Sequence, residues 1–454
     1  MTLAYYVQPD FPEGLQEWLA KGRNWDIEYG GYLSNHMTHN WIVLGAINAS
    51  DEQMQWWEDL YTNKLKDKPA REPADLDPPR PYDRSGPSIF RGNWRKFIED
   101  GRTAYLPYRH FFDRWIGING REEVVREFLP FLLPGLAGAA LHPVIHAGWG
   151  LDAGSDEMVA EGLAYMATAF QPLAGHTSGF AHCHRGDAQA GPIAASVEIL
   201  MKARSNGWAQ ISHEASQTDR YKALKRGSFQ HRIIAFNDPE LPLYAGLNSV
   251  APPFVPLDEG SLLGTIEECV ALITAALKGS GGEFFVLHGL TSLHAILTLL
   301  PHLDPDARRD ALIYWWRAAM ATLIVQSMPG LDRTVELLEK WQKERATNVS
   351  SMPKRGEFDN AWWLAQLQKA SPSHDEHLPK AIYVLWRWSA WRAFSDASER
   401  MMQQLAAKLV TDHPSGQLHE NLWFSRGFSK ASAKREAASR VKAEAQLEVA
   451  DQRI

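Results

Sequence analysis

The sequence predicts an all-α protein built as one large multi-helical domain. Apolar residues recur at intervals of three and four along most of the 454 residues, as in EEVVREFLPFLLPGLAGAALH, SLLGTIEECVALITAALKG and DARRDALIYWWRAAMATLIVQ. Alternating apolar and polar runs, which are typical of half-buried strands, are scarce. No repeat of fixed period occurs, so a solenoid is disfavoured.

Clusters of proline and glycine separate the helical stretches without changing the composition on either side. They lie at 79–87, 175–186, 237–256 and 347–356, and they predict loops. We therefore expect one helical domain over residues 1–429. From Lys430 the sequence AKREAASRVKAEAQLEVADQRI is rich in alanine and charge, which predicts a polar helix or tail over 430–454.

The composition excludes several classes of function. The formal net charge is -7 and no basic stripe occurs, so we expect no nucleic acid partner. The two cysteines, Cys183 and Cys269, cannot form a disulfide framework, which indicates a cytoplasmic protein. Neither a signal peptide nor eighteen uncharged apolar residues in a row occur, so we expect no membrane partner. The sequence leaves the oligomeric state open, a homo-oligomer included.

Histidines carry the strongest chemical signal. In LHPVIHAGWG, His142 and His146 are four residues apart and project from one face of a helix, a spacing that suits two ligands of one metal ion. Pro143 between them means that the helix either starts or bends there. In LSNHMTHNW, His36 and His39 precede an apolar run, which points their rings inward. Each pair is also compatible with histidines that are satisfied by hydrogen bonds, in the core or, for His142 and His146, at the surface.

A third histidine segment is FFVLHGLTSLHA. His288 ends an apolar run, and His294 lies off the same helical face, which makes His288 the better candidate ligand.

A lysine in SPSHDEHLPKAIYVLWRW has unusual surroundings. Ser373 and Glu376 resemble a capping box that opens a helix containing His377 and Lys380. Burial near a helix start disfavours the ammonium form of a lysine. A neutral amine reacts with carbon dioxide to give a carbamate, an anionic oxygen ligand, whereas a lysine that extends its charge to water does not.

A rival metal cluster is GHTSGFAHCHRG, with imidazole and thiolate groups that would suit zinc. Adjacent ligands point in different directions, so we interpret it as a loop near the mouth of a pocket. Its candidate ligands are His176, His182, Cys183 and His184. No nucleophile elbow, HExxH zinc motif, P-loop or dinucleotide fingerprint is present.

The segments LSNHMTHNWIVLGA, LHPVIHAGWGLD, EGLAYMA, VLHGLT and DEHLPKA, in this order, resemble the questin-oxidase-like family over Tyr29 to Arg392. The resemblance implies an all-helical oxygenase that opens a ring of anthraquinone-like aromatic polyketides. It also implies non-haem iron held by four histidines and a carboxylated lysine.

Carried onto this sequence, the resemblance implies a metal site at His142, His146, His288, one histidine of NHMTH, and Lys380 as the carbamate. We prefer His36 as the ligand and assign His39 as a base or orienting group. Leu290 stands where the family stretch has valine, while His288 and Thr291 are kept.

The resulting hypothesis is an Fe(II)-dependent dioxygenase that cleaves a carbon–carbon bond of a small aromatic polyketide with dioxygen. His39 or Thr291 would deprotonate the substrate. Of the 18 tryptophans, Trp149 and Trp386 are candidates for stacking on it. One alternative is an NADPH-dependent monooxygenase of Baeyer–Villiger type, and another is a non-enzymatic helical binding protein.

Overall fold

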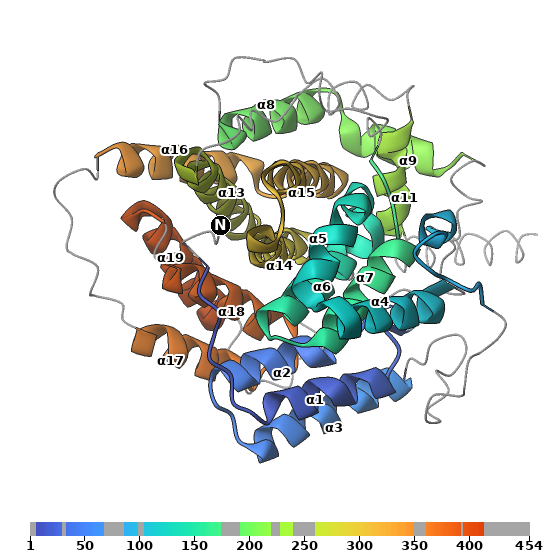
Figure 1. Ribbon diagram of the computed structural model, residues 1–454. Helices are drawn as coiled ribbons and strands as arrows, with labels where there is room; N and C mark the ends of the chain where they lie inside the picture. Colours follow the sequence, from blue (N-terminus) through green and yellow to red (C-terminus); the bar gives the residue numbers. More distant parts are fainter. Residues whose placement is uncertain are drawn as a thin grey trace, which may run out of the picture.

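Helices form almost all of the regular structure in the computed structural model (Figure 1), which confirms the all-α prediction. The structure describes residues 6–29, 33–67, 86–98, 104–173, 191–218, 228–238, 259–347, 360–391 and 394–412. Within these ranges the only sheet is an antiparallel pair, β1 (Glu28–Tyr29) and β2 (Leu33–Ser34). The boundary between the predicted domain and the tail at 430–454 lies outside the described residues, as do most of the predicted loops.

Seventeen α-helices lie within the described residues. In chain order they are α1 (Leu15–Lys21), α2 (Met37–Ala46), α3 (Asp51–Asp67), α4 (Tyr105–Asn119), α5 (Arg121–Leu132), α6 (His142–Asp152), α7 (Asp156–Thr168), α8 (Pro192–Ser205), α9 (Trp208–Ser216), α11 (Ser228–Ile234), α13 (Glu259–Gly279), α14 (Phe284–Leu299), α15 (Pro305–Val325), α16 (Leu331–Thr347), α17 (Asn360–Ala370), α18 (His377–Ala390) and α19 (Asp396–Asp412). Short 3-10 turns include η5 (Gly138–Leu141) and η8 (Leu300–His302).

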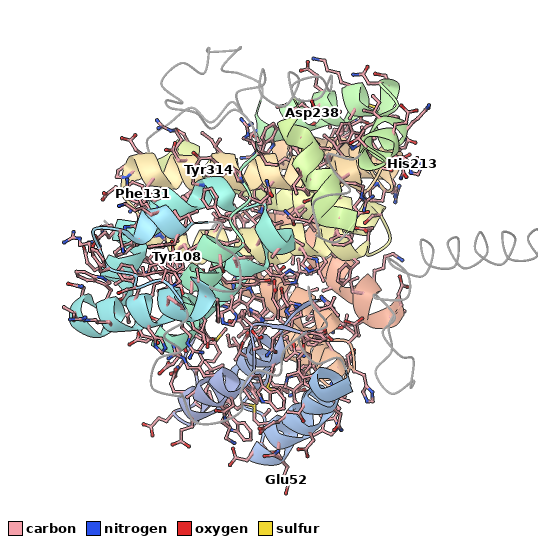
Figure 2. The ribbon with its side chains drawn as sticks, turned by 90° about the vertical axis from the view of Figure 1, so that its right-hand side faces the viewer. Glu52, Tyr108, Phe131, His213, Asp238 and Tyr314 are labelled. Atoms are coloured by element: carbon pink, nitrogen blue, oxygen red, sulfur yellow. The ribbon has the colours of Figure 1, made fainter. Side chains whose placement is uncertain are left out.

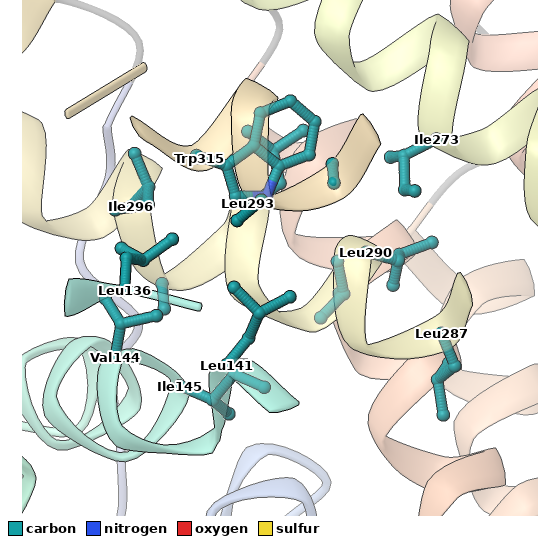
Figure 3. Packing of buried hydrophobic residues seen from close by; sticks show 14 of the residues in the cluster. Leu136, Leu141, Val144, Ile145, Ile273, Leu287, Leu290, Leu293, Ile296 and Trp315 are labelled. Carbon is teal, nitrogen blue, oxygen red and sulfur yellow. The ribbon is translucent and has the colours of Figure 1, made fainter. Parts of the chain in front are cut away.

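The most deeply buried helix is α14, which packs against α6, α13, α15 and α18. Figure 3 shows leucines and an isoleucine of α14 facing Leu141, Val144 and Ile145 at the start of α6, with Trp315 of α15 close by. In contrast, Glu52 and His213 project from the outside of the molecule (Figure 2).

One stretch, Phe284–His302, is long and apolar enough to cross a membrane, although the sequence analysis expected no such segment. In the structure it is almost wholly buried among other helices. Its hydropathy is therefore that of a core helix.

Glycine lets α6 approach its neighbours at backbone distance. A Cβ added at Gly148 would lie 2.5 Å from the Cα of Ala295 in α14, and one added at Gly162 of α7 would lie 2.3 Å from the backbone nitrogen of Ala147. Both distances are far below van der Waals contact. The position of α6 is thus fixed against α7 and α14 by their main chains.

An unusual backbone leads into α6. Ala139, Ala140 and Leu141 have φ angles of 43°, 54° and 70°, in the left-handed region that residues with a side chain seldom adopt. After this turn α6 begins at His142, with Pro143 in its first turn. Of the two possibilities that Pro143 left open, the helix starts there.

Candidate metal centre

Three histidines from distant parts of the chain meet at one point. Nε2 of His142, on the first residue of α6, lies 3.1 Å from Nε2 of His36 and 3.0 Å from Nε2 of His288 in α14. One ring nitrogen from each lies within 4.8 Å of the other two. His36 and His288 are buried, 3% and 2% exposed, and only His142 is partly open.

Hydrogen bonds fix the protonation of two of these rings. Nδ1 of His142 donates to the carbonyl of Ala139 at 2.7 Å, and Nδ1 of His288 donates to the carbonyl of Phe284 at 2.8 Å. Burial lowers the pKa of His142 to about 3, and burial together with His142 lowers the pKa of His288 well below its usual value. Both rings are therefore neutral, with an unprotonated Nε2.

Two unprotonated nitrogens facing each other at 3.0 Å repel, because neither carries a hydrogen to share. A metal ion between them removes the conflict. Two nitrogens that each lie about 2.1 Å from one ion are about 3.0 Å apart when the angle between the bonds is roughly 90°. The spacing and chemistry of the three imidazoles therefore fit a metal site.

Lys380 lies beside this cluster, in the first turn of α18. Its Nζ is 3.1 Å from Nδ1 of His36, and the residue is 2% exposed. The structure thus brings together four of the five residues that the sequence analysis assigned to the metal: His36, His142, His288 and Lys380.

His377 is a neighbour that was not predicted as a ligand from the sequence. Its ring lies 5.2 Å from the ring of His36 and 5.7 Å from that of His288, and it forms a second possible metal-binding group with His36 and Glu376. Nδ1 donates to the carboxylate of Asp375 at 2.7 Å, which leaves Nε2 as the nitrogen with a lone pair. The signal was its position three residues before Lys380, one helical turn away.

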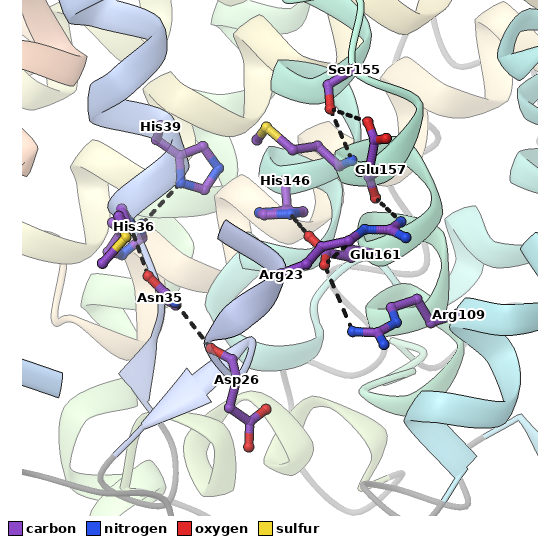
Figure 4. Close-up of polar contacts among 12 residues, drawn as sticks. Arg23, Asp26, Asn35, His36, His39, Arg109, His146, Ser155, Glu157 and Glu161 are labelled. Atoms are coloured by element: carbon purple, nitrogen blue, oxygen red, sulfur yellow. Dashed lines mark hydrogen bonds and ion pairs between the residues drawn. The ribbon is translucent and has the colours of Figure 1, made fainter. Parts of the chain in front are cut away.

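His146, the fifth predicted ligand, has a different partner. Its Nε2 donates to Glu161 of α7 at 3.1 Å, and Glu161 also faces Arg23 and Arg109 (Figure 4). The ring lies 5.2 Å from that of His39, whose Nδ1 is 3.4 Å from Nδ1 of His36. His39 and His146 thus form a second layer beside the first cluster, and the role of His146 as a ligand stays a prediction.

Comparison with known protein families shows which family the chain belongs to. The model of the family described as Questin oxidase-like matches residues 33–385. The chain belongs to the Questin oxidase-like family. A search of curated proteins gave no match. Membership in this family implies an oxidoreductase, and the matched range contains the whole cluster from His36 to Lys380.

The other predicted site residues of this Questin oxidase-like protein differ in their distance from the cluster. Trp149 is fully buried and its ring lies 5.3 Å from that of His39. Trp386 lies at the partly exposed side of α18, where its Nε1 donates to Asn360 at 2.7 Å. The hydroxyl of Thr291 donates to the carbonyl of Leu287 within α14. The catalytic and substrate-binding roles of all three stay predictions.

The start of α18 corrects one local prediction. The helix begins at His377, with Glu376 at the N-cap position, and not at a capping box headed by Ser373. A start at Ser373 would place Pro379 inside the helix, where its ring collides with the preceding turn, whereas a start at His377 places it in the tolerated first turn. His176, His182, Cys183 and His184 of the rival cluster lie outside the described residues.

Proposed function

We propose that this protein is a non-haem iron dioxygenase that cleaves a carbon–carbon bond of an anthraquinone-like aromatic compound. The observation that carries the proposal is the contact at 3.0 Å between Nε2 of His142 and Nε2 of His288, whose Nδ1 atoms are both committed to backbone carbonyls. Membership in the Questin oxidase-like family supports the substrate class.

In this proposal the iron ligands are His36, His142, His288, His377 and Lys380. Nitrogen and oxygen donors of this kind suit iron or manganese. His377 replaces His146 in the set because its ring lies among the other ligands and Asp375 orients it, as outer carboxylates commonly orient metal-binding histidines. His146 is held by Glu161 instead.

Lys380 enters the set as a carbamate. Its neutral amine attacks carbon dioxide, a nitrogen–carbon bond forms, and one proton leaves to solvent, so that a neutral side chain becomes an anionic oxygen donor. The surrounding imidazoles are neutral, since burial lowers the pKa of His36 well below its usual value. A divalent cation in such a setting needs a negative ligand, because an unpaired buried charge is costly.

The remaining residues prepare the substrate. Ferrous iron, when bound, supplies a place for dioxygen to bind and electrons for its reduction. His39 lies next to the ligand His36 and takes a proton from a substrate hydroxyl, which makes the aromatic ring electron-rich. His142 and Phe285 are partly exposed, and Phe285 lies 5.9 Å from His288, so the substrate approaches from this side.

The test combines metal analysis with mass spectrometry. Protein purified from iron-supplemented cells should contain one iron per chain, and gentle ionisation should show the added mass of one carbon dioxide that Lys380→Met lacks. His377→Ala should lose iron, His146→Ala should retain it, and His213→Gln, at an exposed position, should match the wild type.

Turnover of a hydroxyanthraquinone should consume dioxygen without NADPH and stop after chelation. A requirement for NADPH with full activity after iron removal would refute the dioxygenase proposal. Absence of bound metal under these conditions would refute the metal site itself. Loss of iron in His146→Ala but not in His377→Ala would restore the ligand set predicted from the sequence.

A further inference from the structure

A buried carboxylate lies at the end of α6 opposite the proposed ligand His142. Asp152, the last residue of α6, is 0% exposed and accepts four hydrogen bonds. Oδ2 accepts from the hydroxyl of Tyr383 at 2.6 Å and from Nε2 of His294 at 3.2 Å. Oδ1 accepts from Nη2 of Arg387 at 3.1 Å and from the hydroxyl of Tyr6 at 2.9 Å.

These bonds keep the carboxylate charged. Burial alone would raise the pKa of Asp152, but Arg387 and the hydrogen-bond donors hold it well below its usual value. Every donor except Tyr6 belongs to a helix that also carries a proposed ligand.

Three helices each carry both a proposed ligand and a residue of the Asp152 hydrogen-bond network, at different separations along the helix. Along α6 they are His142 and Asp152, along α14 His288 and His294, and along α18 Lys380 and Tyr383. One carboxylate thus connects three helices that are far apart in the sequence.

Trp149 fills the space between the carboxylate and the histidines. Its ring lies 5.0 Å from Tyr383 and 5.7 Å from His294 on one side, and 5.3 Å from His39 on the other. A shift of α18 or α14 at the carboxylate is therefore passed to the imidazoles both through the helices and through this ring.

We propose that Asp152 is a positioning residue for the metal centre, holding α6, α14 and α18 in the register that brings their ligands together. The inference rests on the proposed function, because it assumes that these helices bind a metal ion. Stability alone does not account for the arrangement, since well-packed apolar residues in place of a buried ion pair are often as stabilising or more so. Close backbone contact at Gly148 already holds α6 against α14, and the directional bonds to Asp152 add α18 to the same register.

Two tyrosines provide a matched test. Tyr383→Phe removes a hydrogen bond to Asp152 from α18, a helix that carries proposed metal ligands. Tyr6→Phe removes a hydrogen bond to the same carboxylate from a segment that carries no proposed ligand. We would measure the affinity of each metal-free variant for Fe(II), without oxygen, by competition with a coloured chelator, and record the visible spectrum of the Co(II) form. Melting temperatures would be measured in parallel.

Tyr383→Phe should bind Fe(II) about tenfold more weakly and shift the Co(II) spectrum, at the lower end of the effect of outer-shell changes around metals. Tyr6→Phe should stay within about twofold of the wild type, although both variants melt earlier. His294→Asn cuts the corresponding bond from α14 and should behave like Tyr383→Phe, which keeps the test available if one variant fails to fold.

The proposal would be overturned if the metal affinity were the same in all three variants, Tyr383→Phe, His294→Asn and Tyr6→Phe, and only their melting temperatures fell. Asp152 would then be a stabilising group. A wild-type protein that binds neither ion would overturn the metal site itself, a failure recognisable before any variant is compared.

Discussion

Acid should unfold the metal-free protein within a narrow range of pH. Four imidazoles of the cluster are strongly affected: burial, followed by the neighbouring histidines and Lys380, lowers the pKa values of His36, His39 and His288 well below the usual 6.5. The pKa of His142 falls to about 3. In the unfolded chain the same groups titrate near about 6.5. Between these values the unfolded state is protonated and the folded state is not.

The sign follows from this difference. Unfolding takes up protons below about pH 6.5, so the stability due to the neutral rings is fully present above that pH and is lost as the pH falls. Four protons at about 1.4 kcal/mol each amount to about 5 kcal/mol per pH unit once the unfolded rings are fully charged. A domain stabilised by about 5–15 kcal/mol should therefore unfold roughly one to three units below pH 6.5.

The assay is urea unfolding, followed by tryptophan fluorescence, at pH values between about 5 and 7.5 after removal of metal. His142→Gln should reduce the slope of the free energy of unfolding by about 1.4 kcal/mol per pH unit, the share of one proton. His213→Gln, on the exposed surface of α9, should leave the slope unchanged (Figure 2). A free energy of unfolding that does not change between about pH 7 and pH 5 would refute the conclusion that the rings are held neutral.

Three further results are expected. Burial raises the pKa of Glu283, the N-cap residue of α14, to about 7, so the stability that its protonated form contributes is present at low pH and lost as the pH rises through about 7. Glu283→Gln should remove that loss, which amounts to at most about 3 kcal/mol in the free energy of unfolding. Urea unfolding at about pH 5 and about pH 8 measures the difference. Gly148→Ala should destabilise the protein by at least about 1–3 kcal/mol, because the new methyl group meets Ala295, whereas Gly14→Ala, with open space around it, should not; calorimetry separates the two. Addition of Fe(II) without oxygen should raise the melting temperature in proportion to the logarithm of free metal, and a melting temperature independent of Fe(II) would contradict a folded-state metal site.

Local sequence patterns predicted the fold class and some of the residues that meet in the candidate metal centre. Helical periodicity is a property of neighbouring residues, so the all-α architecture could be predicted from the sequence. The spacing of four between His142 and His146 correctly indicates one face of α6. That face, however, meets two different neighbours: His142 faces His36 and His288, while His146 meets Glu161 of α7. Spacing along one helix carries no information on what packs against each turn.

The residues that were missed depend on contacts between distant segments. Asp152 and Arg387 are 235 residues apart in sequence, and nothing near either of them indicates the other. Lys380 could be assigned to the metal only through the family resemblance, because a lysine in an apolar helix ordinarily extends its charge to water. The tryptophan content did not indicate which tryptophans lie near the histidines. The ring of Trp149 contacts that of His39, whereas Trp386 lies at the partly exposed side of α18.

The apolar character of α14 matters while the chain is being made. Two of the helices that cover it, α15 and α18, follow it in the sequence. When α14 leaves the ribosome, it is apolar enough to resemble a membrane-spanning segment. At that stage two of the four helices that pack against it have not yet been synthesised. The arrival of α18 shields this segment and also delivers Lys380 to the histidines. The covering of α14 and the assembly of the proposed metal centre therefore occur together during synthesis, and a chain that ends before α18 lacks both.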